Sequence, residues 1–105
     1  MTNTKKLTWE KLREKVYIKH LARDETRDFQ FDIIKLESNT TYPSHKHADV
    51  EWVYVFKGDF TDEFGHFKEG DFKINPKDSW HTITTSSQGC ELLVCWCGKL
   101  VSVDQ

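Results

Sequence analysis

Two histidines, one residue apart, stand directly before an apolar run in the stretch "PSHKHADVEWVYVFKG". In an extended strand, side chains two positions apart point to the same face and lie about 7 Å apart at the backbone. His45 and His47 would therefore converge on one point in front of a sheet, and Glu51 has the same parity. Two imidazoles and a carboxylate are a ligand set that first-row divalent metals accept. His81, after the turn "NPKDSW", is a fourth candidate ligand on a later strand.

The histidine pair alone is weak evidence, because two histidines at this spacing are also typical of a solvated strand face. The pattern gains weight from a correctly phased acid, from Gly58 and from a later segment with glycine, proline and histidine in order. Cys95 and Cys97 also share a face, but their apolar run "LLVCWC" favours small core residues over ligands. We interpret His20 and His66 as surface residues. Four acids, Asp59, Asp62, Glu63 and Glu69, are interpreted as a solvated rim. Within it, Asp62 and Glu63 are interpreted as part of a turn.

Strands must carry these residues. The stretches "DFQFDIIKLE", "VEWVYVF" and "CELLVCWC" are rich in β-branched and aromatic residues, either in alternation or in continuous runs. Glycine and proline punctuate short strand-like pieces between residues 57 and 85. Such a series predicts an all-β sandwich or barrel. The opening segment predicts a short amphipathic helix beginning near Thr8 or an extended segment, and residues 15–22 fit a strand.

The run from Val50 to Phe56 is apolar at odd and even positions alike, so both faces of this strand should be covered. Val53 and Val55 share the parity of Glu51 and are predicted to line the cavity beside the ligands. Trp52, Tyr54 and Phe56 would point to the opposite face. A second subunit could cover that face, which predicts a homodimer.

Composition limits the remaining possibilities. A chain of 105 residues has room for one core, so we expect a single domain over residues 1–105. Fifteen basic against seventeen acidic residues give a net charge of -2 without a basic stripe, which argues against nucleic acid or a membrane as partner. The N-terminus lacks the apolar region of a secretion signal, and no stretch is long enough to span a bilayer. Three cysteines favour reduced thiols and a cytoplasmic location.

Taken together, the metal-ligand pattern resembles the two motifs of the cupin superfamily. The first motif, G-x5-HxH-x3,4-E-x6-G, is matched by His45, His47, Glu51 and Gly58, and the second, G-x5-PxG-x2-H-x3-N, by Gly70, Pro76 and His81. Three positions depart from the motifs. Asn39 and Asp78 replace glycines, and Thr85 replaces the closing Asn. Asn and Asp tolerate left-handed backbone geometry better than other non-glycine residues, so we expect the first two to leave the chain path unchanged.

Over about residues 29–97, the sequence resembles more narrowly the ChrR-like cupins. The resemblance implies an antiparallel double-stranded β-helix, or jelly roll, and one divalent metal ion held by His45, His47, Glu51 and His81. Fe²⁺ or Zn²⁺ would be that metal, with Mn²⁺ or Ni²⁺ as further candidates, and a small molecule would bind in the metal cavity.

Members of this group suggest two functions. One is a metal-dependent oxygenase that acts on a small diketone or aromatic ketone. The alternative is a non-catalytic metal-binding sensor related to the C-terminal domain of a zinc-dependent anti-sigma factor. That factor binds its sigma partner through a segment with paired cysteines, which we do not find here, since every cysteine follows Gln88. A metal-free structural cupin is the third possibility, and it would leave four phased ligands without a use.

Overall fold

The computed structural model describes residues 2–47 and 49–97, without the side chains of Ser44 and His45. A 3-10 turn at Thr4–Lys6 precedes eight strands, and every strand pairing is antiparallel. The strands are β1 (Glu10–Arg13), β2 (Val16–Asp24), β3 (Phe29–Leu36), β4 (Thr41–Lys46), β5 (Glu51–Asp62), β6 (Gly65–Lys68), β7 (Phe72–Asn75) and β8 (Trp80–Cys97). The expected all-β class is confirmed.

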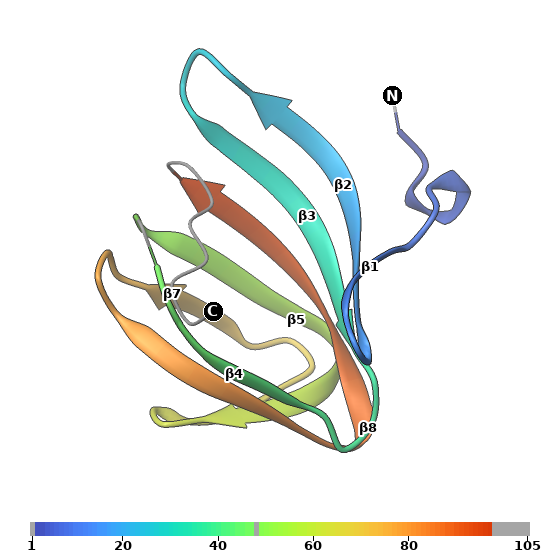
Figure 1. Cartoon of the computed structure of the whole chain (residues 1–105), viewed down its shortest axis with the longest axis vertical. Helices are drawn as coiled ribbons and strands as arrows, with labels where there is room; N and C mark the ends of the chain where they lie inside the picture. Colours follow the sequence, from blue (N-terminus) through green and yellow to red (C-terminus); the bar gives the residue numbers. More distant parts are fainter. Residues whose placement is uncertain (1, 48, 98–105) are drawn as a thin grey trace.

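Two long strands, β5 and β8, join the layers of a jelly roll. The main path of the sheet is β1-β2-β3-β8-β5-β6, with β4 added on β8 and β7 added on β5. The C-terminal half of β8 pairs with β3, and its N-terminal half pairs with β4, so one strand serves both sides of the fold. Figure 1 shows β2 and β3 on one side, β4 on the other, and β8 curving between them. Within the described residues, no helix has the length and apolar character that crossing a membrane requires.

The N-terminal segment is extended, so the helical alternative is wrong there. Residues Glu10–Arg13 form β1, which pairs with β2 around a turn that contains Lys15 at φ 66°. All four residues of β1 are exposed, and Leu12 retains 47% of its accessible surface. The spacing of apolar residues in this segment therefore has no core face behind it. The strand expected over residues 15–22 is confirmed as β2.

The inner face of the sheet is built in four rows, because register partners in an antiparallel sheet lie side by side on one face. The two lower rows are almost wholly apolar, and the two upper rows carry polar groups. Each row runs across β5, β8, β3 and β2 in that order. Counted from Gly58 to Glu51 along β5, which we take as bottom to top, the rows are Gly58, Cys90, Leu36 and Val16; Val55, Leu92, Ile34 and Ile18; Val53, Val94, Asp32 and His20; and Glu51, Trp96, Gln30 and Arg23.

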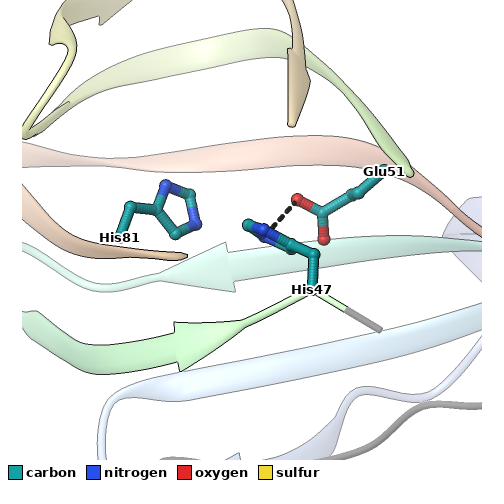
Figure 2. A group of neighbouring side chains, drawn as sticks. All are labelled: His47, Glu51 and His81. Carbon is teal, nitrogen blue, oxygen red and sulfur yellow. Dashed lines mark ion pairs between the residues drawn. The ribbon is translucent and has the colours of Figure 1, made fainter. Parts of the chain in front are cut away.

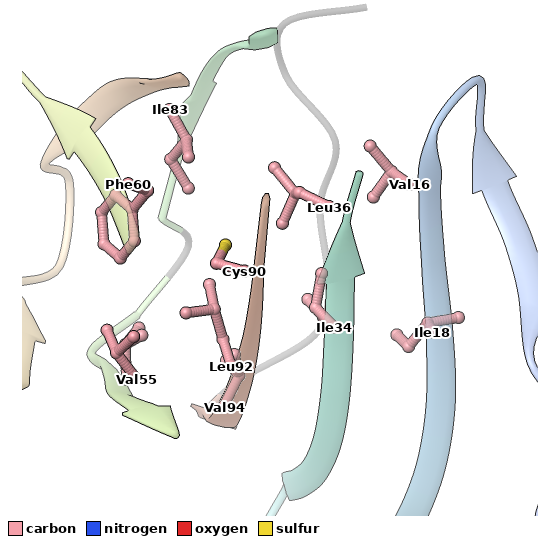
Figure 3. Close-up of a cluster of buried hydrophobic side chains, with 11 residues drawn as sticks. Val16, Ile18, Ile34, Leu36, Val55, Phe60, Ile83, Cys90, Leu92 and Val94 are labelled. Carbon is pink, nitrogen blue, oxygen red and sulfur yellow. The ribbon is translucent and has the colours of Figure 1, made fainter. Parts of the chain in front are cut away.

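The lower rows form the hydrophobic core. Figure 3 shows side chains from β2, β3 and the C-terminal half of β8 directed toward Phe60 of β5 and Ile83 in the N-terminal half of β8, with Val55 beside Leu92. Phe60 is the largest side chain in this cluster and is only 1% exposed. Its ring stacks on that of Phe67 with centroids 5.2 Å apart. As expected from the parity of the strand, Val53 and Val55 face inward, and Trp52, Tyr54 and Phe56 lie on the other face.

The departures from the cupin motifs are accommodated locally. Asn39 and Asp78 have φ values of 51° and 67°, so both occupy the left-handed region that the motif glycines favour. Thr85, in place of Asn, accepts a hydrogen bond from the Thr40 amide (2.9 Å) and donates one to the Glu37 carbonyl (2.7 Å). Gly58 has no substitute, because an added Cβ would lie 2.0 Å from the Gly89 carbonyl oxygen.

Candidate metal centre

Three of the four predicted ligands meet at the end of the sandwich where Glu51 lies, which we call the open end. His47 follows the end of β4, Glu51 begins β5, and His81 is the second residue of β8. One ligand atom from each lies within 4.8 Å of the others, and all three residues are buried. Figure 2 shows their side chains converging from three separate segments of the chain. Residues 34 positions apart in sequence, His47 and His81, have ring centroids only 4.9 Å apart.

His47 is fixed by the turn that precedes β8. Its amide donates to the Ser79 carbonyl (2.9 Å), and its own carbonyl accepts from the Asp78 amide (3.0 Å). Its ring Nδ1 lies 3.0 Å from the Ser79 carbonyl oxygen and 3.0 Å from Ser79 Oγ. A carbonyl oxygen can only accept, so Nδ1 carries a proton and Nε2 is the ring nitrogen that can take a metal ion or a second proton.

Glu51 faces that nitrogen. Its Oε1 lies 3.2 Å from His47 Nε2, the contact marked in Figure 2, and accepts a hydrogen bond from Asn75 Nδ2 at 2.7 Å. Asn75 is the register partner of Glu51 on β7, so the neighbouring strand orients the carboxylate. Two electron-pair donors thus face each other in a buried site. Such an arrangement is favourable only with a proton or a cation between them.

His81 is oriented by a carboxylate instead of a carbonyl. Its Nδ1 lies 2.9 Å from Asp62 Oδ2, and the same oxygen accepts from Lys73 Nζ. The other oxygen of Asp62 accepts from the Phe64 amide at 2.8 Å. The Lys73 ammonium lies 5.0 Å and 4.7 Å from the ring centroids of Phe64 and Phe67. The result is a buried His–Asp–Lys chain that turns Nε2 of His81 toward the site.

The charge of Asp62 is maintained in spite of its burial. Burial by itself raises the pKa of this carboxyl, but hydrogen bonds from Lys73, His81 and the Phe64 amide outweigh it and leave the pKa below its ordinary value. Its side chain is 0% exposed and that of Lys73 is 8% exposed. An ionised Asp62 can only accept from His81, so Nδ1 of His81 carries a proton and Nε2 is its candidate metal-ligand atom.

The sequence also predicts roles for His45, Asp62 and the cysteines. The fourth predicted ligand, His45, is the register partner of His81 on β4, and its side chain lies outside the described residues. The interpretation of Asp62 as part of a solvated rim is wrong, because this residue lies beneath His81. Its neighbour Glu63 accepts from the amide of Thr82, the residue after His81, at 2.9 Å. The three cysteines are free thiols.

Comparison with known proteins decides the family. The profile of the ChrR cupin-like domain matches residues 1–100. The chain belongs to this family. Among curated proteins, a search found no significant relative.

Solved structures show the same cupin fold at low sequence identity. The chain superposes on one in the Rhodobacter sphaeroides SigE–anti-sigma ChrR complex with a TM-score of 0.79 and 22% identity, covering 90% of this chain but only 50% of that one. It matches an acetylacetone dioxygenase from Acinetobacter johnsonii with a TM-score of 0.75 and 14% identity, over 86% of this chain and 64% of that one. The match to the polyketide cyclase RemF from Streptomyces resistomycificus has a TM-score of 0.80 and 18% identity, over 99% of this chain and 87% of that one. At these identities the likeness shows the fold alone.

The donor set of this cupin fits a divalent metal ion. Neutral imidazoles and a carboxylate suit Fe²⁺, Zn²⁺, Mn²⁺ and Ni²⁺. Each described ligand also has its own orienting partner: Ser79 for His47, Asn75 for Glu51 and Asp62 for His81. Such partners fix the tautomer and the ring orientation of metal-binding histidines.

Proposed function

We propose that the protein binds one divalent metal ion through His45, His47, Glu51 and His81. The observation that carries this proposal is the buried convergence of His47, Glu51 and His81, whose ligand atoms lie within 4.8 Å of one another. Within it, His47 Nε2 and Glu51 Oε1 are 3.2 Å apart, and a cation between them would be coordinated by both. His45 completes the set on the basis of the sequence pattern and its backbone register with His81.

We further propose that the metal centre belongs to an oxygenase-type enzyme acting on a small diketone or aromatic ketone. Fe²⁺ bound here would supply the redox chemistry that dioxygen requires and would polarise the carbonyl oxygens of a ligand. Val53, on the inner face two residues after Glu51, gives the site an apolar wall suited to such a ligand. The acetylacetone dioxygenase among the structural neighbours supports this substrate class.

A second candidate is a non-catalytic metal sensor. It is favoured by the family match and by the SigE–ChrR structure, in which a cupin of this type is part of an anti-sigma factor. The metal, Zn²⁺ in this case, would then hold the open end of the sandwich in one conformation.

The two functions are separated by metal analysis followed by oxygen uptake. Protein purified without added metal is analysed for Fe, Zn, Mn and Ni, and oxygen consumption is then measured with β-diketones and hydroxyaryl ketones. An oxygenase is expected to hold a redox metal and to consume oxygen only when a substrate is present. Tightly held zinc without turnover of any compound would favour the sensor.

We also propose a homodimer in the cytoplasm. On the outer face Tyr54 is 40% exposed, and its register partners Phe72 and Leu93 are 60% and 36% exposed. An apolar cluster of this kind is typical of a protein interface. Light scattering over a concentration series tests the dimer, and Tyr54→Lys is expected to shift it toward monomer.

Three free thiols support a reducing compartment.

A further inference from the structure

Trp96 stands next to Glu51 in the top row of the inner face. The two residues are register partners on β8 and β5, so they lie side by side about 4.8 Å apart at the backbone. On its other side Trp96 pairs with Gln30 of β3, and its side chain packs against the hydrophobic core. A strand on each side therefore fixes the position of this residue beside the metal centre.

The indole nitrogen of Trp96 is a buried donor without an acceptor. Nε1 is shielded from solvent and forms no hydrogen bond in the part of the chain that the structure describes. An indole N–H can only donate, and a buried donor without a partner is unfavourable. A phenylalanine ring would fill the same row without that cost. Packing alone therefore does not account for the nitrogen.

Glu51 has acceptor atoms beside this indole but takes its hydrogen bond from the other side. Its Oε1 accepts from Nδ2 of Asn75, its neighbour on β7, at 2.7 Å. Trp96, its neighbour on β8, donates no hydrogen bond to it. Asn75 already orients the carboxylate, so the indole is not needed for that purpose.

Gln30, on the other side of Trp96, is engaged with β2 and β3. Its Oε1 accepts from Arg23 Nη1 (2.9 Å), and its Nε2 donates to Asp32 Oδ2 (2.8 Å). The other oxygen of Asp32, Oδ1, lies 2.9 Å from Nδ1 of His20, whose ring is 51% exposed, as expected of a surface residue. Neither neighbour of Trp96 in the row thus uses the indole hydrogen.

We propose that Trp96 Nε1 donates a hydrogen bond to an oxygen atom of the small molecule that binds at the metal centre. This inference rests on the proposed metal centre and names the ligand class, a molecule with a carbonyl, enolate or carboxylate oxygen directed toward β8. From a position beside Glu51, such a molecule needs to span only one strand spacing, about 4.8 Å, to reach Trp96. Trp96 is then a specificity-determining residue of the site.

The donor favours an oxygen that carries negative charge. Hydrogen bonds to charged acceptors are stronger than those between neutral groups, and a buried site strengthens them further. A methyl or N–H group in the same place would leave the indole unsatisfied, so ligands that present one are selected against. The indole keeps its proton throughout, and Trp96 positions the ligand without taking part in proton transfer.

The first experiment observes the indole directly. The chain has four tryptophans, Trp9, Trp52, Trp80 and Trp96, so zinc-loaded protein with isotope-labelled tryptophan gives four indole N–H signals by NMR. The signal missing from Trp96→Phe is that of Trp96. Addition of acetylacetone, a β-diketone, is expected to move this signal downfield by more than any of the other three. If Trp96→Phe fails to fold, phenylalanine at the other three positions assigns the signal by elimination.

The second experiment compares two ligands that bind metals through different atoms. Acetylacetone binds through oxygen, whereas imidazole binds through one nitrogen and then has only an N–H left. Trp96→Phe is expected to weaken acetylacetone binding to the zinc-loaded protein about 10- to 100-fold, which corresponds to one hydrogen bond to a charged acceptor. Calorimetric titration should show an unchanged affinity for imidazole.

The chain offers a matched control for this substitution. Trp52 follows Glu51 on β5 and is half-buried like Trp96, but it lies on the outer face, where its register partners are Ile74 and Cys95. Trp52→Phe should therefore leave the affinities for both ligands at wild-type values. Metal content and thermal unfolding of each variant show whether the centre and the fold are intact.

The outcomes separate this inference from the metal centre. A Trp96 signal that stays in place while acetylacetone binds would overturn the hydrogen bond and leave the metal centre standing. Equal weakening of both ligands in Trp96→Phe, or of neither, would do the same, and so would zinc-loaded wild type that binds no acetylacetone. Wild-type protein that takes up no metal would overturn the metal centre and this inference with it.

Discussion

The closed end of the inner face, made of the rows of Gly58 and Val55, is built by the same strands as the open end, made of the rows of Val53 and Glu51. The side chains of the closed end are apolar, whereas those of the open end include buried polar groups. At the closed end, the row of Leu36 and Cys90 packs under Phe60 without a charged side chain. At the open end, the same strands carry Asp32 in the row of Val53 and Glu51 in the next row. The apolar rows supply the stability of the sandwich, and that stability permits buried polar groups to be held in fixed positions at the other end.

The largest expected effect is on the open end. His47→Ala removes a buried donor atom and the anchor to the Ser79 turn, and we expect it to abolish stoichiometric metal binding. Metal analysis after dialysis measures this directly. His66→Ala, which removes an exposed histidine, should keep full metal content. Unchanged metal content in His47→Ala would refute the assignment of the centre.

A substitution at the closed end should act on folding instead. Phe60→Ala deletes the largest buried side chain of the core and should lower the free energy of unfolding by about 3–5 kcal/mol. Urea denaturation gives this value. The folded fraction should still bind metal with one-to-one stoichiometry. If metal affinity falls in parallel with stability, the two ends are not separable.

A smaller effect tests the support beneath His81. Asp62→Asn keeps the size of the side chain but removes the charge that orients Nδ1, and it should weaken metal binding about 10- to 100-fold. A competition titration with a chromophoric chelator measures the affinity. Asp59→Asn removes a carboxylate that holds a histidine elsewhere and is the matched control.

The Asp62 variant also leaves Lys73 without its buried counter-charge, which could lower stability on its own. The double variant Asp62→Asn, Lys73→Met removes both charges and should recover stability without recovering metal affinity. Recovery of the affinity in this variant would show that the carboxylate does not orient the ligand.

The smallest change concerns reactivity at the closed end. Burial raises the pKa of the Cys90 thiol to about 12, so at pH 8 only about one molecule in ten thousand carries the thiolate. In a Cys95→Ser, Cys97→Ser background, we expect a thiol reagent to modify Cys90 only as fast as the protein unfolds. Rapid modification of the folded protein would indicate that the closed end opens locally.

The sequence predicts the strands well because strand patterns depend on short-range periodicity. Alternation placed Val53 and Val55 inward, and the left-handed tolerance of Asn39 and Asp78 followed from their chemistry. Other features depend on contacts that no spacing rule carries. Asp62 lies in "TDEFG", which has the composition of an exposed turn, yet its partners Lys73 and His81 are 11 and 19 residues away.

The N-terminal segment illustrates the opposite error. Its apolar residues are spaced as on one face of a helix, but the segment pairs with β2, and all four residues of β1 remain exposed. The link between His20 and Asp32 was also hidden, since it depends on the register of two strands joined by a hairpin.

The turn from Pro76 to Ser79 has a kinetic consequence. It holds His47 through backbone and side-chain hydrogen bonds, and His81 follows it two residues after Ser79. One local opening of this turn would therefore release two donors together instead of one after the other. Metal exchange would then follow the opening rate of a single turn, and a bound ion would slow hydrogen exchange at the amides of His47, Asp78 and Ser79 more than anywhere else in the fold.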